Sequence, residues 1–107
     1  MNSYFKFLDT RALDEKAASG IFPFGQNLFW DTPVQNIHLQ QHKRYIIERV
    51  LTRGFLQDFY LLLKIYTIEQ IKEAVVKNKE LDPRTAHFCS EYFQIPKEQI
   101  PVSSFYH

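Results

Sequence analysis

The chain of 107 residues has one cysteine and three glycines, and both shortages exclude classes of protein. The single thiol of Cys89 cannot form an internal disulfide, which is typical of a reducing compartment, and we expect a cytoplasmic location. We interpret Cys89 as a small core residue on the inward face of a helix. The three glycines match neither a dinucleotide-binding loop nor a P-loop, so we do not expect nucleotide hydrolysis.

An excess of one charge and a long apolar run are also missing. Thirteen Lys and Arg face twelve Asp and Glu, and a net charge of +1 provides no field that would draw the whole chain onto nucleic acid. The densest apolar segment, residues 55–66, contains Asp58 and Lys64 and is shorter than the ~20 residues that cross a bilayer. The N-terminus lacks the apolar core of a signal peptide. We therefore expect a soluble protein without a membrane partner.

Patterns that serve catalysis or metal binding are not found either. Of the four histidines, only His87 lies close to the cysteine, and two positions on a helix are about 200° apart around its axis. The carboxylates are scattered over predicted helix faces, and no spacing singles out an acid and base pair. We expect no metal, no cofactor and no enzymatic activity.

The chain does contain clear helical patterns from Pro33 onward. The predicted elements are a short helix near 33–37 and four main helices at 39–53, 55–66, 67–79 and 82–94. Gly54 lies where a helix end often needs a left-handed residue, and Thr67 begins a capping box with Gln70. These patterns predict an all-α fold, a small bundle of about four main helices.

We divide the chain into a helical domain, residues 28–107, and an N-terminal extension, residues 1–27. Ser19-Gly20 and the proline and glycine near position 24 interrupt the extension before any period is established. We therefore expect the N-terminal extension to be poorly, or only partly, ordered.

Aromatic residues make up 16% of the chain, and four of them lie within nine residues. These four are Phe22, Phe24, Phe29 and Trp30. One interpretation is structural: Leu28, Phe29 and Trp30 plug the end of the bundle, while Asp31 or Thr32 caps the next turn. The other is functional: the four aromatic side chains stay partly exposed and form a docking patch for a protein partner.

A basic strip on the predicted 39–53 helix also has two interpretations. His42, Arg49 and Arg53 fall within about 40° of one another on one flank of the apolar stripe. They could anchor an acidic partner or phosphates, or they could pair with acidic residues within the fold. The candidate acidic residues for such pairs are Asp31, Glu48 and Asp58.

The last helices also fit a helix-turn-helix in which residues 82–94 read DNA. The outward residues of that helix would be Arg84, Thr85, His87, Ser90, Glu91 and Gln94. They include one arginine and one acid, whereas a DNA-reading helix normally carries more positive charge. We therefore rank DNA binding behind protein contact.

Two motifs resemble a family of small uncharacterised bacterial proteins over about residues 28 to 95. The first is L-F-W-D at residues 28–31, and the second is I-I-x-R-V-L-x-x-G at residues 46–54. The resemblance identifies Trp30, Asp31, Arg49, Gly54 and Asp58 as motif positions of unknown role. Some members of that family are encoded beside nucleotidyltransferase-like toxins, which implies an antitoxin-like partner role by association.

Arg49 paired to Asp31 or Asp58 is the structural hypothesis that these motif positions suggest. For function, we expect a protein-interaction module whose partner is another protein, such as a toxin. The alternatives are a small helix-turn-helix regulator and a homo-oligomer that associates through the apolar 55–66 helix.

Overall fold

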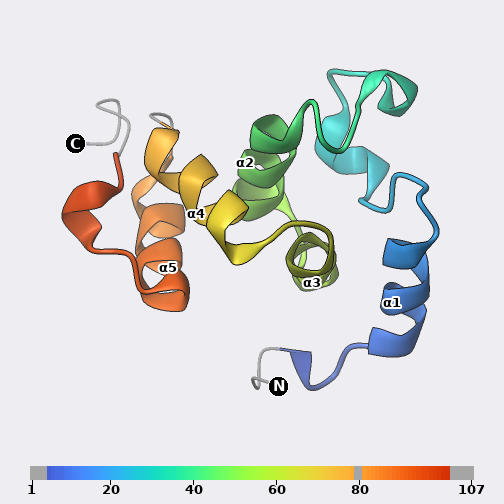
Figure 1. The fold of residues 1–107 in the computed structure, drawn as a ribbon, viewed down its shortest axis with the longest axis horizontal. Coiled ribbons are helices and arrows are strands. Elements are labelled where there is room, and N and C mark those ends of the chain that lie inside the picture. The colour runs from blue at the N-terminus through green and yellow to red at the C-terminus, as the bar shows by residue number, and fades with distance from the viewer. Residues whose placement is uncertain (1–4, 79–80, 102–107) are drawn as a thin grey trace. The chain divides into compact units, whose positions relative to one another are not determined.

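The structure, a computed structural model, describes residues 5–78 and 81–101 and is all-helical, as predicted (Figure 1). Its α-helices are α1 (Thr10–Ala18), α2 (Lys43–Arg53), α3 (Leu56–Ile65), α4 (Ile68–Lys77) and α5 (Pro83–Phe93). Short 3-10 turns are η2 (Gln26–Phe29), η3 (Val34–Asn36) and η4 (Lys97–Gln99). The chain divides into two compact units, residues 1–66 and residues 67–107.

Residues 5–27 contain a helix, α1, that the sequence pattern does not announce. Asp9 caps its first turn by accepting a hydrogen bond from the backbone N–H of Ala12 at 3.2 Å. The hydroxyl of Tyr60 on α3 donates to Asp14 of α1 at 2.7 Å, and the ring of Phe5 packs edge-on against that of Tyr60. Because α1 has no fully buried residue, its docking depends on these contacts with α3 rather than on an apolar stripe.

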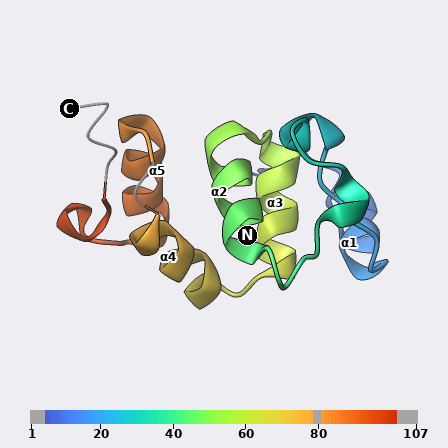
Figure 2. The same ribbon diagram turned by 90° about the horizontal axis from the view of Figure 1, so that it is seen from above.

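Helices α2 and α3 pack against each other and form the core of the first unit (Figure 2). Ile46, Ile47 and Val50 form the buried face of α2, as the predicted stripe requires. Helix α3 buries Asp58 together with four apolar residues, Phe59, Tyr60, Leu61 and Leu62. Predicted helix 39–53 begins only at Lys43, because His38 and His42 form a separate turn before it.

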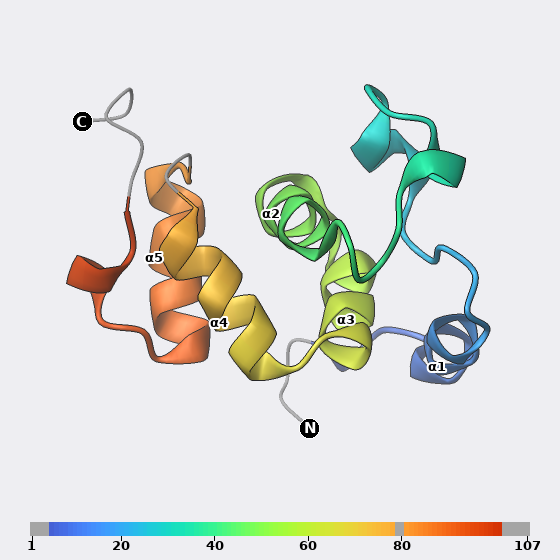
Figure 3. The ribbon, with the colours of Figure 1, turned by 45° about the horizontal axis from the view of Figure 1, so that its top comes forward.

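The second unit consists of α4, α5 and η4, with α4 and α5 in contact (Figure 3). The predicted capping box is present: Gln70 N–H donates to the Thr67 hydroxyl at 3.1 Å and Thr67 N–H donates to the Gln70 side chain at 2.9 Å. Asp82 accepts from the N–H of Thr85 and so caps α5, which Pro83 begins. These local signals explain why the boundaries of both helices agree closely with the sequence prediction.

Within the residues that the structure describes, no helix combines the length and the apolar character needed to cross a lipid bilayer.

Candidate functional site

The carboxylate of Asp58 joins two segments of the first unit. One oxygen accepts from the N–H of Gly25 at 3.2 Å, and the other accepts from the N–H of Phe55 at 3.0 Å. Asp58 lies in the first turn of α3 with only 4% of its surface exposed. It therefore caps α3 and at the same time fastens the 24–30 segment to the start of that helix.

Arg49 forms a second set of hydrogen bonds that holds the same segment; we call the hydrogen bonds of Asp58 and of Arg49 the two fastenings. Its guanidinium donates to the carbonyl of Leu28 at 2.7 Å and to both carboxylate oxygens of Asp31, at 3.2 Å and 3.0 Å. The hydroxyl of Tyr45 donates to Asp31 at 3.0 Å, and the guanidinium lies over the Tyr45 ring. Of the two pairings that the motif suggested, the structure shows the one with Asp31.

The four clustered aromatic residues do not form one exposed patch. Phe24 and Phe29 are buried, and Phe22 is half-buried with its ring edge-on to both of theirs. Phe24 and Phe29 are therefore corrected from docking residues to core residues. Their burial follows from mutual ring packing and from the contact of Phe29 with Tyr45.

Trp30 corrects the expectation that it plugs the bundle, because its side chain is 73% exposed. In the 3-10 turn η2, successive side chains point about 120° apart. Phe29 and Leu28 point into the core, so the next residue, Trp30, is directed toward solvent. The plug therefore consists of Leu28 and Phe29, and Trp30 is the one exposed side chain among the four clustered aromatic residues.

The predicted basic strip separates into three different roles. His42 accepts the N–H of His38 on its Nδ1 atom at 2.9 Å, in the turn that precedes α2. Arg49 is occupied by Asp31 and Leu28. Arg53, one helical turn after Arg49, is exposed, and its side chain makes no hydrogen bond or ion pair with residues 5–78 and 81–101. Only Arg53 of the three is an uncompensated cation.

Gly54 is required for its size and not for a left-handed conformation. Its φ of −75° and ψ of 159° are extended, which corrects the helix-end prediction. A Cβ atom at this position would lie 2.6 Å from the Val50 carbonyl oxygen and 3.2 Å from the Cβ of Asp58. The last turn of α2, through the Val50 carbonyl, and less closely Asp58 of α3 therefore leave no room for a side chain here without a local shift.

Two exposed apolar residues near these fastenings were missed in the sequence analysis. Ile21 is 72% exposed and Phe55 is 68% exposed. Phe55 follows Gly54 directly and precedes α3, in a segment whose sequence is apolar on nearly every side. Periodicity carries no signal in such a segment, because it cannot tell which apolar side chain is left outside the core.

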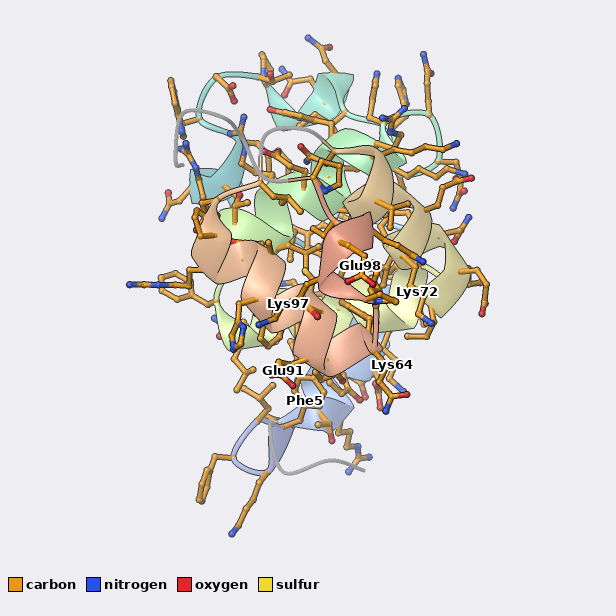
Figure 4. All side chains as sticks on the ribbon, turned by 90° about the vertical axis from the view of Figure 1, so that its left-hand side faces the viewer. Phe5, Lys64, Lys72, Glu91, Lys97 and Glu98 are labelled. Atoms are coloured by element: carbon orange, nitrogen blue, oxygen red, sulfur yellow. The ribbon has the colours of Figure 1, made fainter. Side chains whose placement is uncertain are left out.

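Residues on the outward face of α5 were only partly predicted. Thr85 is buried, which corrects its predicted outward position, whereas Arg84, His87, Glu91 and Gln94 are exposed. Ser90 is half-buried and its hydroxyl donates to the carbonyl of Ile95 at 2.7 Å. In this unit the labelled side chains Lys72, Lys97, Glu91 and Glu98 carry both signs of charge (Figure 4).

Metal-binding side chains are not gathered in the part of the chain that the structure describes. It holds no cluster of three or more His, Cys, Asp or Glu side chains suited to a metal ion. Burial raises the pKa of the Cys89 thiol to about 12, so this thiol is neutral near pH 7. The fully buried Cys89 is therefore a core residue, as predicted.

The Arg49–Asp31 pair makes stability depend on pH in a defined direction. The hydrogen bonds from Arg49 hold the pKa of the Asp31 carboxyl below its ordinary value. When the folded-state pKa is the lower one, the stabilisation is complete above the unfolded-state pKa of about 4. It is lost as the pH falls from there through the folded-state pKa.

We expect Arg49→Ala to lower the free energy of unfolding by about 1.5 kcal/mol at pH 7, because hydrogen bonds to Leu28 and Asp31 are lost. The difference from wild type should shrink as the pH falls from about 4 through the lowered folded-state pKa of Asp31, because the folded protein then also takes up the proton. Urea denaturation followed by circular dichroism at pH 7 and pH 3 measures both effects. Arg53→Ala is the matched control on the same helix, and equal losses in the two variants would contradict the role of the pair.

Comparisons with known proteins give one match to a family model and no activity. Neither a search of curated proteins nor a search of solved structures found a match to this chain. No enzyme is therefore among the matches. Residues 24–75 match the model of a protein family described as a family of unknown function (DUF6922). This range contains Arg49, Asp58 and the residues to which their side chains are hydrogen-bonded.

Proposed function

We propose that this chain is a non-enzymatic protein-interaction module that contacts its partner through Trp30. The observation that carries the proposal is the exposed indole of Trp30 on a segment whose neighbours are fixed on both sides. Leu28 and Phe29 are buried before it, and Asp31 is held by Arg49 and Tyr45 after it. An aromatic side chain on a fixed backbone loses little conformational entropy when it binds.

The residue type supports the same reading. Tryptophan is among the residues most enriched at the energetic centre of protein interfaces, because it buries a large area with few rotatable bonds. Isolated apolar residues are normal on a protein surface, so exposure alone is a weak argument. The fixed position of Trp30 between two anchored residues is what favours a contact role.

The finer proposal is an antitoxin-like role, in which the chain masks a nucleotidyltransferase-type toxin. Its support is the resemblance of the L-F-W-D and I-I-x-R-V-L-x-x-G motifs to a family with such gene neighbours. The exposed indole of Trp30 supports contact with a protein, and co-expression with a nucleotidyltransferase tests whether that protein is a toxin.

A DNA-binding role for α4 and α5 has less support. Residues 67–107 contain five Lys and Arg against six Asp and Glu, so this unit has no basic field. On α5, His87 lies 3.8 Å from Glu91 and Arg84 is the single arginine. DNA binding would depend steeply on salt, whereas contact through an apolar centre would depend on it much less.

Trp30→Ala is expected to weaken partner binding about tenfold or more, because truncating a tryptophan at the centre of an interface typically costs about 1.4 kcal/mol of binding free energy or more. The tagged chain is used to isolate its partner from native lysate, and the affinity of the purified pair is then measured. An adjacent nucleotidyltransferase, where one is encoded, is expressed with the chain to test whether its toxicity is neutralised.

Phe7→Ala is the matched control, since Phe7 is also a highly exposed aromatic residue of the same unit. It should leave the affinity unchanged, and both variants should keep the wild-type circular dichroism spectrum. Equal affinity of Trp30→Ala and wild type for the purified partner would overturn the proposal.

A further inference from the structure

We infer that a second contact region at the α2–α3 corner, made of Arg53, Phe55 and Leu56, acts together with Trp30 and selects a protein partner with acidic side chains beside apolar ones. This inference rests on the proposed function and deepens it by assigning the chemistry of the partner. It adds Phe55 and Leu56, which neither motif contains.

Exposure at the corner is concentrated in residue types that drive protein contact. Phe55 is 68% exposed, Leu56 is 41% exposed, and Arg53 is exposed beside them in the chain. Arginine and aromatic residues are enriched at protein interfaces, where the guanidinium contacts a carboxylate and the ring fills an apolar pocket. An exposed arginine next to an exposed aromatic residue therefore favours a partner surface that carries both acidic and apolar side chains.

The corner is fixed in place, which separates it from an ordinary exposed loop. The N–H of Gly54 donates to the Val50 carbonyl at 2.8 Å, and the N–H of Phe55 donates to Asp58 at 3.0 Å. The short connection between α2 and α3 leaves little freedom at this point (Figure 2). Binding through the corner therefore requires little ordering of the backbone.

Asp58 also connects the corner to the segment that carries Trp30. Its second oxygen accepts from the N–H of Gly25, five residues before Trp30 in the chain. Arg49, which holds the other end of that segment, lies one helical turn before Arg53. The hydrogen bonds of Asp58 and Arg49 thus fix the backbone both near Trp30 and at the corner.

Charge at the corner determines which partner fits. Helix α2 contains Lys43, Arg44, Arg49 and Arg53 but a single acidic residue, Glu48. Asp31 compensates Arg49, while both oxygens of Asp58 accept backbone N–H groups and leave Arg53 uncompensated. Residues 1–66 as a whole contain eight Lys and Arg against six Asp and Glu. An acidic protein surface complements this charge.

A protein fits this corner better than a nucleic acid or an anionic membrane. Nucleic acid contacts use several cations along a backbone, and stable attraction to anionic lipid sums about 1 kcal/mol from each of several Lys or Arg. The corner offers one uncompensated cation next to two apolar side chains. One cation beside two apolar side chains is a composition typical of a protein interface.

The test uses the purified full chain and a phage-displayed library of random linear peptides. Peptides are selected on wild type, and their affinities are then measured for Trp30→Ala, Phe55→Ala and Arg53→Glu. Lys97→Glu is the matched charge control, because Lys97 is an exposed cation of the second unit. Circular dichroism and thermal melting of each variant confirm that it is folded as wild type is.

We expect enriched peptides to place Asp or Glu next to aromatic or aliphatic residues. Their affinity should fall about tenfold or more for each of Trp30→Ala, Phe55→Ala and Arg53→Glu, and should not change for Lys97→Glu. In a second selection, Arg53→Glu should enrich peptides with Lys or Arg at the same position.

Peptides that need Trp30 but bind Arg53→Glu as tightly as wild type would overturn the inference and leave the proposed function standing. Failure to enrich any Trp30-dependent peptide would overturn both. Arg53-dependent binding to vesicles of phosphatidylcholine and phosphatidylserine, without acidic peptides in the selection, would replace the protein partner by a membrane surface.

Discussion

Asp58→Ala is expected to lower the free energy of unfolding by about 3 kcal/mol, the largest effect of any single change at the fastenings. The substitution removes the acceptor of two backbone hydrogen bonds, from Gly25 and from Phe55. It also leaves a small cavity, since Asp58 is almost fully buried. Urea denaturation followed by circular dichroism measures the loss.

Asp58→Asn separates the effect of losing the hydrogen bonds from the effect of losing side-chain volume. The amide keeps one oxygen acceptor of similar size, so its loss should be about half that of the alanine variant. Glu15→Ala, which removes an exposed carboxylate of the same unit, should stay within about 0.5 kcal/mol of wild type. An Asp58→Ala variant as stable as Glu15→Ala would show that the network does not hold the segment.

Gly54→Ala is expected to lower the free energy of unfolding by about 2 kcal/mol through steric overpacking. The new Cβ would lie 2.6 Å from the backbone oxygen of Val50, which cannot move without displacing the end of α2. The smaller backbone entropy of unfolded alanine offsets only about 0.5 kcal/mol of this cost. Thermal and urea denaturation measure the difference.

Gly25→Ala is the matched control for this second effect. Gly25 has a φ of −60°, and a Cβ there would meet Asp58 at 3.9 Å, an ordinary contact distance. We expect its stability to change by less than about 0.5 kcal/mol. If Gly54→Ala were tolerated equally well, the close approach of the Val50 carbonyl would not be what requires glycine.

Under the proposed function, both substitutions should also weaken partner binding, because Asp58 holds Gly25 and Phe55 and Gly54 lies at the corner itself. Weakening either fastening should reduce partner affinity through disorder of the contact residues rather than through a lost contact. A stability loss without a change in affinity would show that Trp30 and Phe55 bind independently of the network that holds them.

Local signals explain the parts of the fold that could be predicted. The Thr67–Gln70 capping box, the Asp82 cap with Pro83, and the apolar face of Ile46, Ile47 and Val50 all act between residues close in the chain. Such signals need no knowledge of the tertiary structure. Four of the five described α-helices were therefore predicted near their observed positions.

Helix α1 was not predicted as a packed element because its contacts are distant in sequence. Asp14 meets Tyr60 across 46 positions, and Phe5 packs on the same residue. No periodic stripe on α1 records these partners, since none of its residues is fully buried. Only the folded position of α3 provides the surface on which α1 docks.

The candidate site divides in the same way. By itself the sequence determined an all-helical chain with well-placed caps, because caps and apolar periods are visible in one dimension. Trp30, Asp31, Arg49, Gly54 and Asp58 were singled out by the resemblance of two sequence motifs to a family. The tertiary structure decided that Phe29 is buried and Trp30 exposed, and that Gly54 is needed for space. Exposure and close approach depend on which distant side chains fill the neighbouring volume, and that is a property of packing that no local pattern contains.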